Sequence, residues 1–187
     1  GSVVEGNWTP GTSGSFCGVG RGAGIYFGDP SSSLDIRNTV VQCNSSLVPG
    51  TCEATGSAVY LYEGSLEMTN CTVARNGAQS ANDPAVYNSG GTATLRNCIL
   101  FWNNPSGPCG GPVVYGAQIG GPGATAVTYS DVQGCYVGTG NICVNPGFSD
   151  SGSANCDPSA MPFCGSLNTA LLSTSACIDA GNPATGD

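Results

Sequence analysis

Hydrophobic and polar residues alternate in short runs along the chain, and similar runs return at intervals. Residues 34–38 read Leu-Asp-Ile-Arg-Asn, and residues 66–70 read Leu-Glu-Met-Thr-Asn. Residues 93–97 repeat this pattern, and residues 126–130 follow it more weakly. Alternation with period two is typical of a β-strand, whose successive side chains point to opposite faces. The pattern therefore predicts one strand of the same kind in each of four repeats.

Two further strand signals accompany each of these runs. An apolar residue followed by tyrosine comes before the run, and a short apolar segment comes after it. The first signal comprises Ile25-Tyr26, Val59-Tyr60, Val86-Tyr87 and Val114-Tyr115, and the second comprises Thr39–Val41, Cys71–Val73, Cys98–Leu100 and Asp131–Gln133. Equivalent residues recur once per unit, which favours parallel stacking of successive units over hairpins. We expect an all-β, right-handed parallel β-helix of about four to five coils.

Asparagine closes the central run of three units, at Asn38, Asn70 and Asn97. Asparagine tolerates a left-handed bend, and its amide can bond to the amides above and below it. We therefore expect these residues to form an inward-facing structural ladder. A further asparagine column lies at Asn44, Asn76 and Asn103. By the same parity, the predicted core stacks are Leu34, Ile36, Leu66, Met68, Leu95, Val40, Thr72 and Ile99.

The repeat fades after about residue 133, which suggests two regions. Residues 1–133 are expected to form the coils, with Gly/Pro/Ser-rich loops at 28–33, 45–55, 77–84 and 105–112. Residues 134–187 lack a clear strand column but hold five of the eleven cysteines. A solenoid end exposes unpaired backbone and apolar core. We therefore expect residues 134–187 to form a disulfide-braced C-terminal cap.

Composition narrows the possible functions. The chain has 187 residues, no His and no Lys, and a formal net charge of −8. Without His there is no Ser-His-Asp or Cys-His catalytic machinery and no imidazole metal site. Four scattered arginines give no basic footprint for nucleic acid. No run of about 18 apolar residues exists to insert into a membrane. We expect no bound metal ion and no cofactor.

The C-terminal motifs resemble those of a known protein group. Residues 129–134 read Tyr-Ser-Asp-Val-Gln-Gly, residues 138–142 read Gly-Thr-Gly-Asn-Ile, and residues 175–183 read Ser-Ala-Cys-Ile-Asp-Ala-Gly-Asn-Pro. Together with Asn145–Phe148, they resemble the end of bacterial right-handed β-helix surface proteins of the choice-of-anchor and polymorphic outer-membrane groups. Asn145 and Cys177 depart from that pattern, and Cys177 suggests an added disulfide. The resemblance implies a secreted or cell-surface protein and no single activity.

Eleven cysteines favour an oxidising compartment. Cys71 and Cys98 follow the asparagines of successive coils, so we expect them to stack at a Cα separation near 4.8 Å and form a disulfide. Short loops favour three local pairs, Cys43–Cys52, Cys135–Cys143 and Cys156–Cys164. Cys17, Cys109 and Cys177 remain. Because eleven is odd, at least one cysteine has no disulfide partner among the other ten. It is a buried free thiol, or its partner lies outside this sequence or in another chain.

Two surface columns are candidates for binding or catalysis. Asp35 and Glu67 occupy equivalent outward positions, as carboxylates of β-helix polysaccharide enzymes do. Arg37 lies two residues from Asp35 on the same face, so ordinary surface pairing is the favoured interpretation. Tyr26, Tyr60, Tyr87 and Tyr115 would form an outward ladder able to contact sugar rings or a neighbouring subunit.

These patterns favour a non-enzymatic extracellular or cell-surface structural protein. The open end of a β-helix is an adhesive edge, and head-to-tail stacking of identical subunits would produce a filament or matrix. The alternative is a polysaccharide-binding or polysaccharide-degrading module similar to pectate lyases. The first predicts homo-oligomers and the second a glycan partner.

Overall fold

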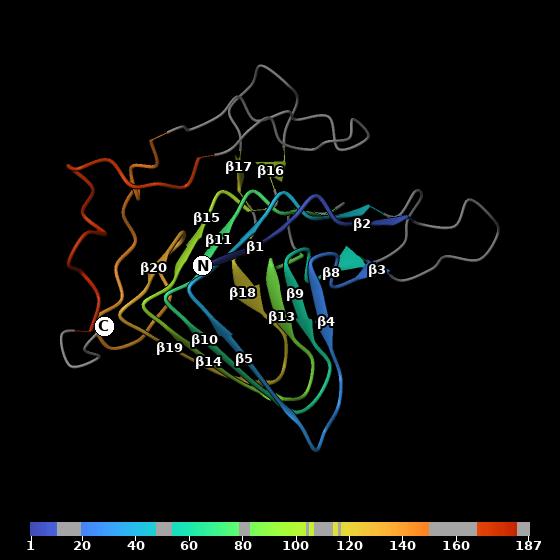
Figure 1. The fold of residues 1–187 in the computed structure, drawn as a ribbon. Coiled ribbons are helices and arrows are strands. Elements are labelled where there is room, and N and C mark those ends of the chain that lie inside the picture. Colours follow the sequence, from blue (N-terminus) through green and yellow to red (C-terminus); the bar gives the residue numbers. More distant parts are fainter. Residues whose placement is uncertain are drawn as a thin grey trace.

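The computed structural model describes residues 1–10, 20–47, 54–78, 83–103, 105–106, 114–115, 117–149 and 168–182. Every regular element in these ranges is a β-strand, and the larger sheets are entirely parallel. Strands β5, β10, β14 and β19 lie side by side in Figure 1, although each comes from a different repeat. The described part of the chain is therefore all-β, as the period-two alternation predicts.

Four sheets carry the repeats, and each is named here after one of its strands. The β5 sheet contains β5 (Ser33–Arg37), β10 (Ser65–Thr69), β14 (Thr92–Arg96) and β19 (Ala124–Thr128). The β6 sheet contains β1 (Ser2–Glu5), β6 (Thr39–Gln42), β11 (Thr72–Ala74), β15 (Ile99–Phe101) and β20 (Asp131–Val132). The β4 sheet contains β4 (Ile25–Phe27), β9 (Val59–Leu61), β13 (Val86–Asn88) and β18 (Ile119–Gly120). The β7 sheet contains β2 (Trp8–Pro10), β7 (Ser45–Leu47) and β12 (Gly77–Ala78).

Two short pairs complete the regular structure. Strands β3 (Gly20–Arg21) and β8 (Ala54–Thr55) pair in parallel. Strands β16 (Pro105–Ser106) and β17 (Val114–Tyr115) pair antiparallel. Strands β7, β12 and β16 lie within segments that the sequence predicts to be loops. Their composition signals a turn, but their backbone groups still pair.

Successive repeats pair residue by residue. Leu66 of β10 pairs with Leu34 of β5 on one side and with Ala93 of β14 on the other. In the β4 sheet, Tyr60 pairs in the same way with Tyr26 and Tyr87. Each strand therefore bonds to its equivalent in the next repeat, as the sequence predicts for the first three repeats.

The fourth repeat is displaced by one residue from the sequence alignment. Arg96 pairs with Thr128, so the position after it, Asn97, corresponds to Tyr129 and not to Ser130. The alternation of apolar and polar residues in 124–128 is too weak to fix the register from sequence. The register is set by the pairing of β19 with β14.

The core is built from one face of each sheet. Side chains of the β5 sheet are buried as predicted at Ile36, Leu66, Met68 and Leu95, whereas Leu34 is half-buried. In the β6 sheet the predicted parity is wrong. The buried residues are Val41, Val73, Leu100 and Val132, and the expected Val40, Thr72 and Ile99 are only half-buried.

The bend between the β5 and β6 sheets explains this change of parity. Asn70 has a φ of 54° and points outward, whereas the next residue, Cys71, is buried. Thr69, before the bend, also lies on the outer face, so two successive side chains leave the core. Simple alternation fails because the left-handed backbone at this residue turns the chain while its side chain still points outward. The other outward residues at this bend are Asn38, Asn97 and Tyr129, with φ values of 49°, 52° and 51°.

A buried ladder of amides runs through the interior at the next bend. The Nδ2 of Asn44 donates to Oδ1 of Asn76 at 2.9 Å, and the Nδ2 of Asn76 donates to Oδ1 of Asn103 at 2.9 Å. Asn7 begins the ladder by donating to Asn44, and Gln118 ends it by accepting from Asn103. The three central asparagines have no exposed surface. The inward ladder is therefore formed by this second asparagine column.

The C-terminal region covers the last repeat. The Ile142 N–H donates to Ser130 O, and Val132 N–H donates to Ile142 O, at 2.9 and 3.0 Å. Cys135 and Cys143 form the predicted disulfide in this region. The ring of Phe148 lies 5.4 Å from that of Trp102, edge to face. These contacts agree with a braced cap, and the boundary at residue 133 stays a prediction.

Candidate functional site

The outer asparagines form an exposed column, in contrast to the inward ladder predicted for them. Asn38 and Asn70 are exposed and Asn97 is half-buried. The Nδ2 of Asn97 donates to Oδ1 of Asn70 at 3.1 Å, and the backbone N–H of Asn182 donates to Oδ1 of Asn97 at 2.9 Å. The left-handed bend is confirmed, and its geometry is the reason that the amides point outward.

The predicted Cys71–Cys98 disulfide is absent, because both residues are thiols. The Cys71 Sγ lies 3.3 Å from the carbonyl oxygen of Thr69, and the Cys98 Sγ lies 3.2 Å from that of Arg96. Each thiol thus bonds to the carbonyl two residues before it. Each sulfur also lies near a carbonyl oxygen of the preceding repeat, Ile36 O for Cys71 at 3.3 Å and Met68 O for Cys98 at 3.5 Å.

Hydroxyl residues make the same contact in the first and fourth repeats. The Oγ1 of Thr39 donates to Arg37 O at 2.8 Å, and the Oγ of Ser130 donates to Thr128 O at 2.9 Å. Cys71 and Cys98 therefore occupy a column of small side-chain donors. A hydrogen bond from Cys98 lowers the pKa of Cys71, while the same bond and burial raise the pKa of Cys98.

The remaining cysteines divide between described and undescribed segments. Cys43 is disulfide-bonded. Its expected partner Cys52 lies outside the described residues, as do Cys17, Cys109, Cys156 and Cys164. Cys177 is a thiol whose Sγ lies 3.1 Å from Oδ2 of Asp131. Burial raises the pKa of Cys177 to about 12, and the bond to Asp131 acts in the same direction. This thiol is therefore not activated as a nucleophile.

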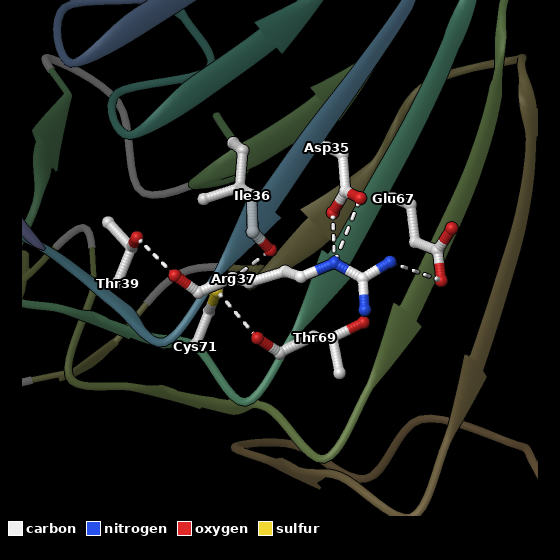
Figure 2. Close-up of polar contacts among 7 residues, drawn as sticks. All are labelled: Asp35, Ile36, Arg37, Thr39, Glu67, Thr69 and Cys71. Carbon is white, nitrogen blue, oxygen red and sulfur yellow. Dashed lines mark hydrogen bonds and ion pairs between the residues drawn. The ribbon is translucent and has the colours of Figure 1, made fainter. Parts of the chain in front are cut away.

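The two candidate carboxylates lie on an exposed face and share one arginine (Figure 2). The Nε of Arg37 bonds to both carboxylate oxygens of Asp35, and its Nη2 lies 4.0 Å from Oε1 of Glu67. The hydrogen bond and charge of Asp35 raise the pKa of Arg37. This is the surface pairing that the spacing predicts, and about half of each side chain is exposed to solvent.

The tyrosines of the first three repeats stack on one another. The Tyr26 and Tyr60 ring centroids are 5.5 Å apart, and those of Tyr60 and Tyr87 are 5.3 Å apart. Tyr60 is only 3% exposed, and the Arg21 guanidinium lies over its ring. Tyr26, Tyr60 and Tyr87 therefore form a ladder in register, as predicted, but the central ring of Tyr60 is buried between its neighbours and has little surface open to a ligand.

Tyr115 does not belong to this column. Strand β17 pairs with β16, and the partner of Tyr87 in the fourth repeat is Gly120. The valine-tyrosine signal at residues 114–115 therefore lies five residues before Ile119 and Gly120, which complete the sheet.

A cavity follows the outer asparagine column. It has a volume of about 930 Å³. Asn38, Asn70, Asn97 and Tyr129 lie along it at equivalent positions of successive repeats, and residues 177–182 form its opposite wall. We call this cavity the asparagine groove. It lies within the usual size range of small-molecule sites, roughly 300–1,000 Å³.

Two carboxylates line the asparagine groove. Asp131 is 3% exposed, accepts a hydrogen bond from the Val144 N–H at 3.1 Å, and has a pKa raised by desolvation. Asp179 is exposed. Within the described ranges, no three His, Cys, Asp or Glu side chains are grouped to hold a metal ion. The same ranges contain no helix long and apolar enough to cross a membrane.

Sequence reasoning found the asparagines of this groove but missed the groove itself. The wall at residues 177–182 comes from the C-terminal part of the sequence, and no local sequence pattern predicts its position beside the asparagines. Comparisons of the chain with protein-family models, with curated proteins and with solved structures each found no match.

Proposed function

We propose that the chain is a right-handed parallel β-helix with a C-terminal cap. Four parallel sheets in which each strand bonds to its equivalent in the next repeat support this architecture. The handedness follows the general rule that crossovers between parallel strands are right-handed in about 98% of cases.

We propose further that this β-helix is a non-enzymatic structural protein of the extracellular space or cell surface. The observation that carries the proposal is the buried amide ladder from Asn7 to Gln118. The side-chain amides of this ladder form hydrogen bonds from one repeat to the next, so they hold the repeats together. A fully satisfied buried network makes a rigid and specific interior.

The location rests on separate support. Disulfide bonds at Cys43 and Cys135–Cys143 are typical of proteins from oxidising compartments. The C-terminal motifs that resemble bacterial surface proteins point in the same direction.

Head-to-tail self-assembly receives less support. Stacking requires a free strand edge at each end, but Ile142 already bonds to the edge formed by Ser130 and Val132. A second copy would have to displace this segment. We therefore do not base the proposed structural role on filament formation.

Two measurements test the structural role and location. Immunogold labelling of intact source cells should place the protein on their surface or outside them. Limited proteolysis of the purified protein should leave residues 54–78 and 83–103 largely resistant under native conditions. Rapid cleavage within β9, β10 or β11, or labelling confined to the cytoplasm, would contradict the proposal.

A further inference from the structure

The asparagine groove has unused hydrogen-bonding capacity that the structural role does not require. Asn38 and Asn70 are exposed. Asn70 accepts a bond from Asn97, but the described residues give its Nδ2 no acceptor and give the Asn38 side chain no partner. An amide offers both donors and an acceptor. The groove therefore presents paired donor and acceptor groups, repeated along one line.

The repeated groups match the chemistry of hydroxyls. A hydroxyl also donates and accepts, so it can bond to both ends of an amide. The amides carry no charge, and the described carboxylates Asp131 and Asp179 would repel an anionic ligand. Ile99, Ile142 and Tyr129 add apolar contact surface among the polar groups. This combination favours a neutral, hydroxyl-rich ligand.

The spacing of the groups distinguishes a sugar chain from a peptide. Stacked strands place equivalent residues roughly 4.8 Å apart. An extended peptide advances about 3.3–3.4 Å per residue, so its groups fall out of step with the amides. A pyranose linked through opposite ring positions is longer than a peptide residue, because the ring and the bridging oxygen both lie along the chain, so its length per residue comes closer to the spacing of the amides. Among the described residues, the peptide N–H of Asn182 bonds to the side chain of Asn97.

We propose that the asparagine groove binds a neutral 1,4-linked oligosaccharide. Asn38 and Asn70 bond to hydroxyls of adjacent sugar residues, and Ile99 and Tyr129 contact the ring faces. The groove follows four equivalent positions, from Asn38 to Tyr129, and Asn182 bonds to the third of them, Asn97. This site differs from the Asp35 and Tyr26–Tyr87 columns that the sequence suggests for glycans.

Calorimetric titration of the full chain with cellotetraose and mannotetraose tests the proposal. At least one should bind saturably at millimolar concentration. The double variant Asn38→Gly/Asn70→Gly should weaken this binding at least tenfold, as expected for the loss of two hydrogen bonds of about 1 kcal/mol each. Glycine keeps the left-handed backbone, so the fold is preserved. Glu67→Ala, on the exposed face of β10, is the matched control and should leave binding unchanged.

A second measurement keeps the test independent of the variants. In nuclear magnetic resonance spectra of the unaltered protein, the side-chain amide signals of Asn38 and Asn70 should shift during the titration. Those of the buried Asn44 and Asn76 should not. Absence of saturable binding to either tetrasaccharide overturns the proposal, as does binding that the double variant retains. Preferential binding of tetragalacturonate or of an extended peptide also overturns it, because the groove would then select charge or a peptide backbone.

Discussion

The strongest test of the buried amide ladder is Asn76→Ala. The Asn76 Nδ2 donates to the carbonyl oxygens of Val41 and Ala74 at 2.9 and 3.2 Å, and to Oδ1 of Asn103 at 2.9 Å. Its Oδ1 accepts from the backbone N–H and from Nδ2 of Asn44, at 3.0 and 2.9 Å. Alanine removes all of these contacts from a site that has no exposed surface.

The expected loss of stability follows from the groups left behind. Asn44 keeps a bond from its Nδ2 to Val4 O, but its backbone N–H loses its acceptor, Oδ1 of Asn76. The Val41 carbonyl loses a donor as well. A buried group left without a partner costs about 1–3 kcal/mol, so the two together give about 2–6 kcal/mol. This is a large part of the 5–15 kcal/mol that stabilises a typical domain.

Denaturant unfolding followed by far-ultraviolet circular dichroism measures this loss. The matched control is Asn70→Gly, which removes an exposed amide with one side-chain bond while keeping the left-handed backbone. The control should change the free energy of unfolding by less than about 1 kcal/mol. Equal losses in the two variants, or a loss below about 1 kcal/mol for Asn76→Ala, would refute the view that the interior ladder holds the repeats together.

Three further changes test other parts of the fold. Tyr60→Ala should lower the free energy of unfolding by about 3–4 kcal/mol, because Tyr60 is buried within the ring stack. Tyr26→Ala, at the exposed end of the stack, should lower it by about 1 kcal/mol. Similar losses for the two variants in thermal or denaturant unfolding would contradict the burial argument. Cys71→Ser should stay within about 1 kcal/mol of the unaltered protein, because serine can make the same bond to the carbonyl two residues earlier. Asp131 binds its proton more tightly in the folded than in the unfolded state, so its ionisation lowers stability as pH rises from its ordinary pKa of 3.8 through the raised value. Asp131→Asn should therefore gain stability relative to the unaltered protein across that range, and a difference independent of pH would contradict the assigned cause.

Local sequence patterns determined the strands of the first three repeats and their parallel stacking. Leu34, Leu66 and Ala93 recur with the same neighbours, and they pair in register. The Cys135–Cys143 pair was also predictable, because eight residues of sequence separation keep both cysteines within one loop. These features depend on neighbours in the chain or on a regular period.

Tertiary structure decided the parity at each bend. Asn70 was expected inside because it continues the alternation of Leu66 and Met68, yet its left-handed backbone turns its side chain outward. The same turn brings Cys71 inward and gives it a carbonyl acceptor in place of a disulfide partner. Alternation predicts a side chain's direction only while the backbone stays extended.

Sequence alone thus determined the strands of the β4, β5 and β6 sheets in the first three repeats, because strand formation and stacking there follow periodic patterns of apolar residues. Only the tertiary structure decided which asparagines lie inside, where the fourth repeat aligns, and that residues 177–182 form a wall beside Asn97. The physical reason is that these features depend on a few backbone angles and on contacts between residues far apart in the chain. Those same contacts create the asparagine groove.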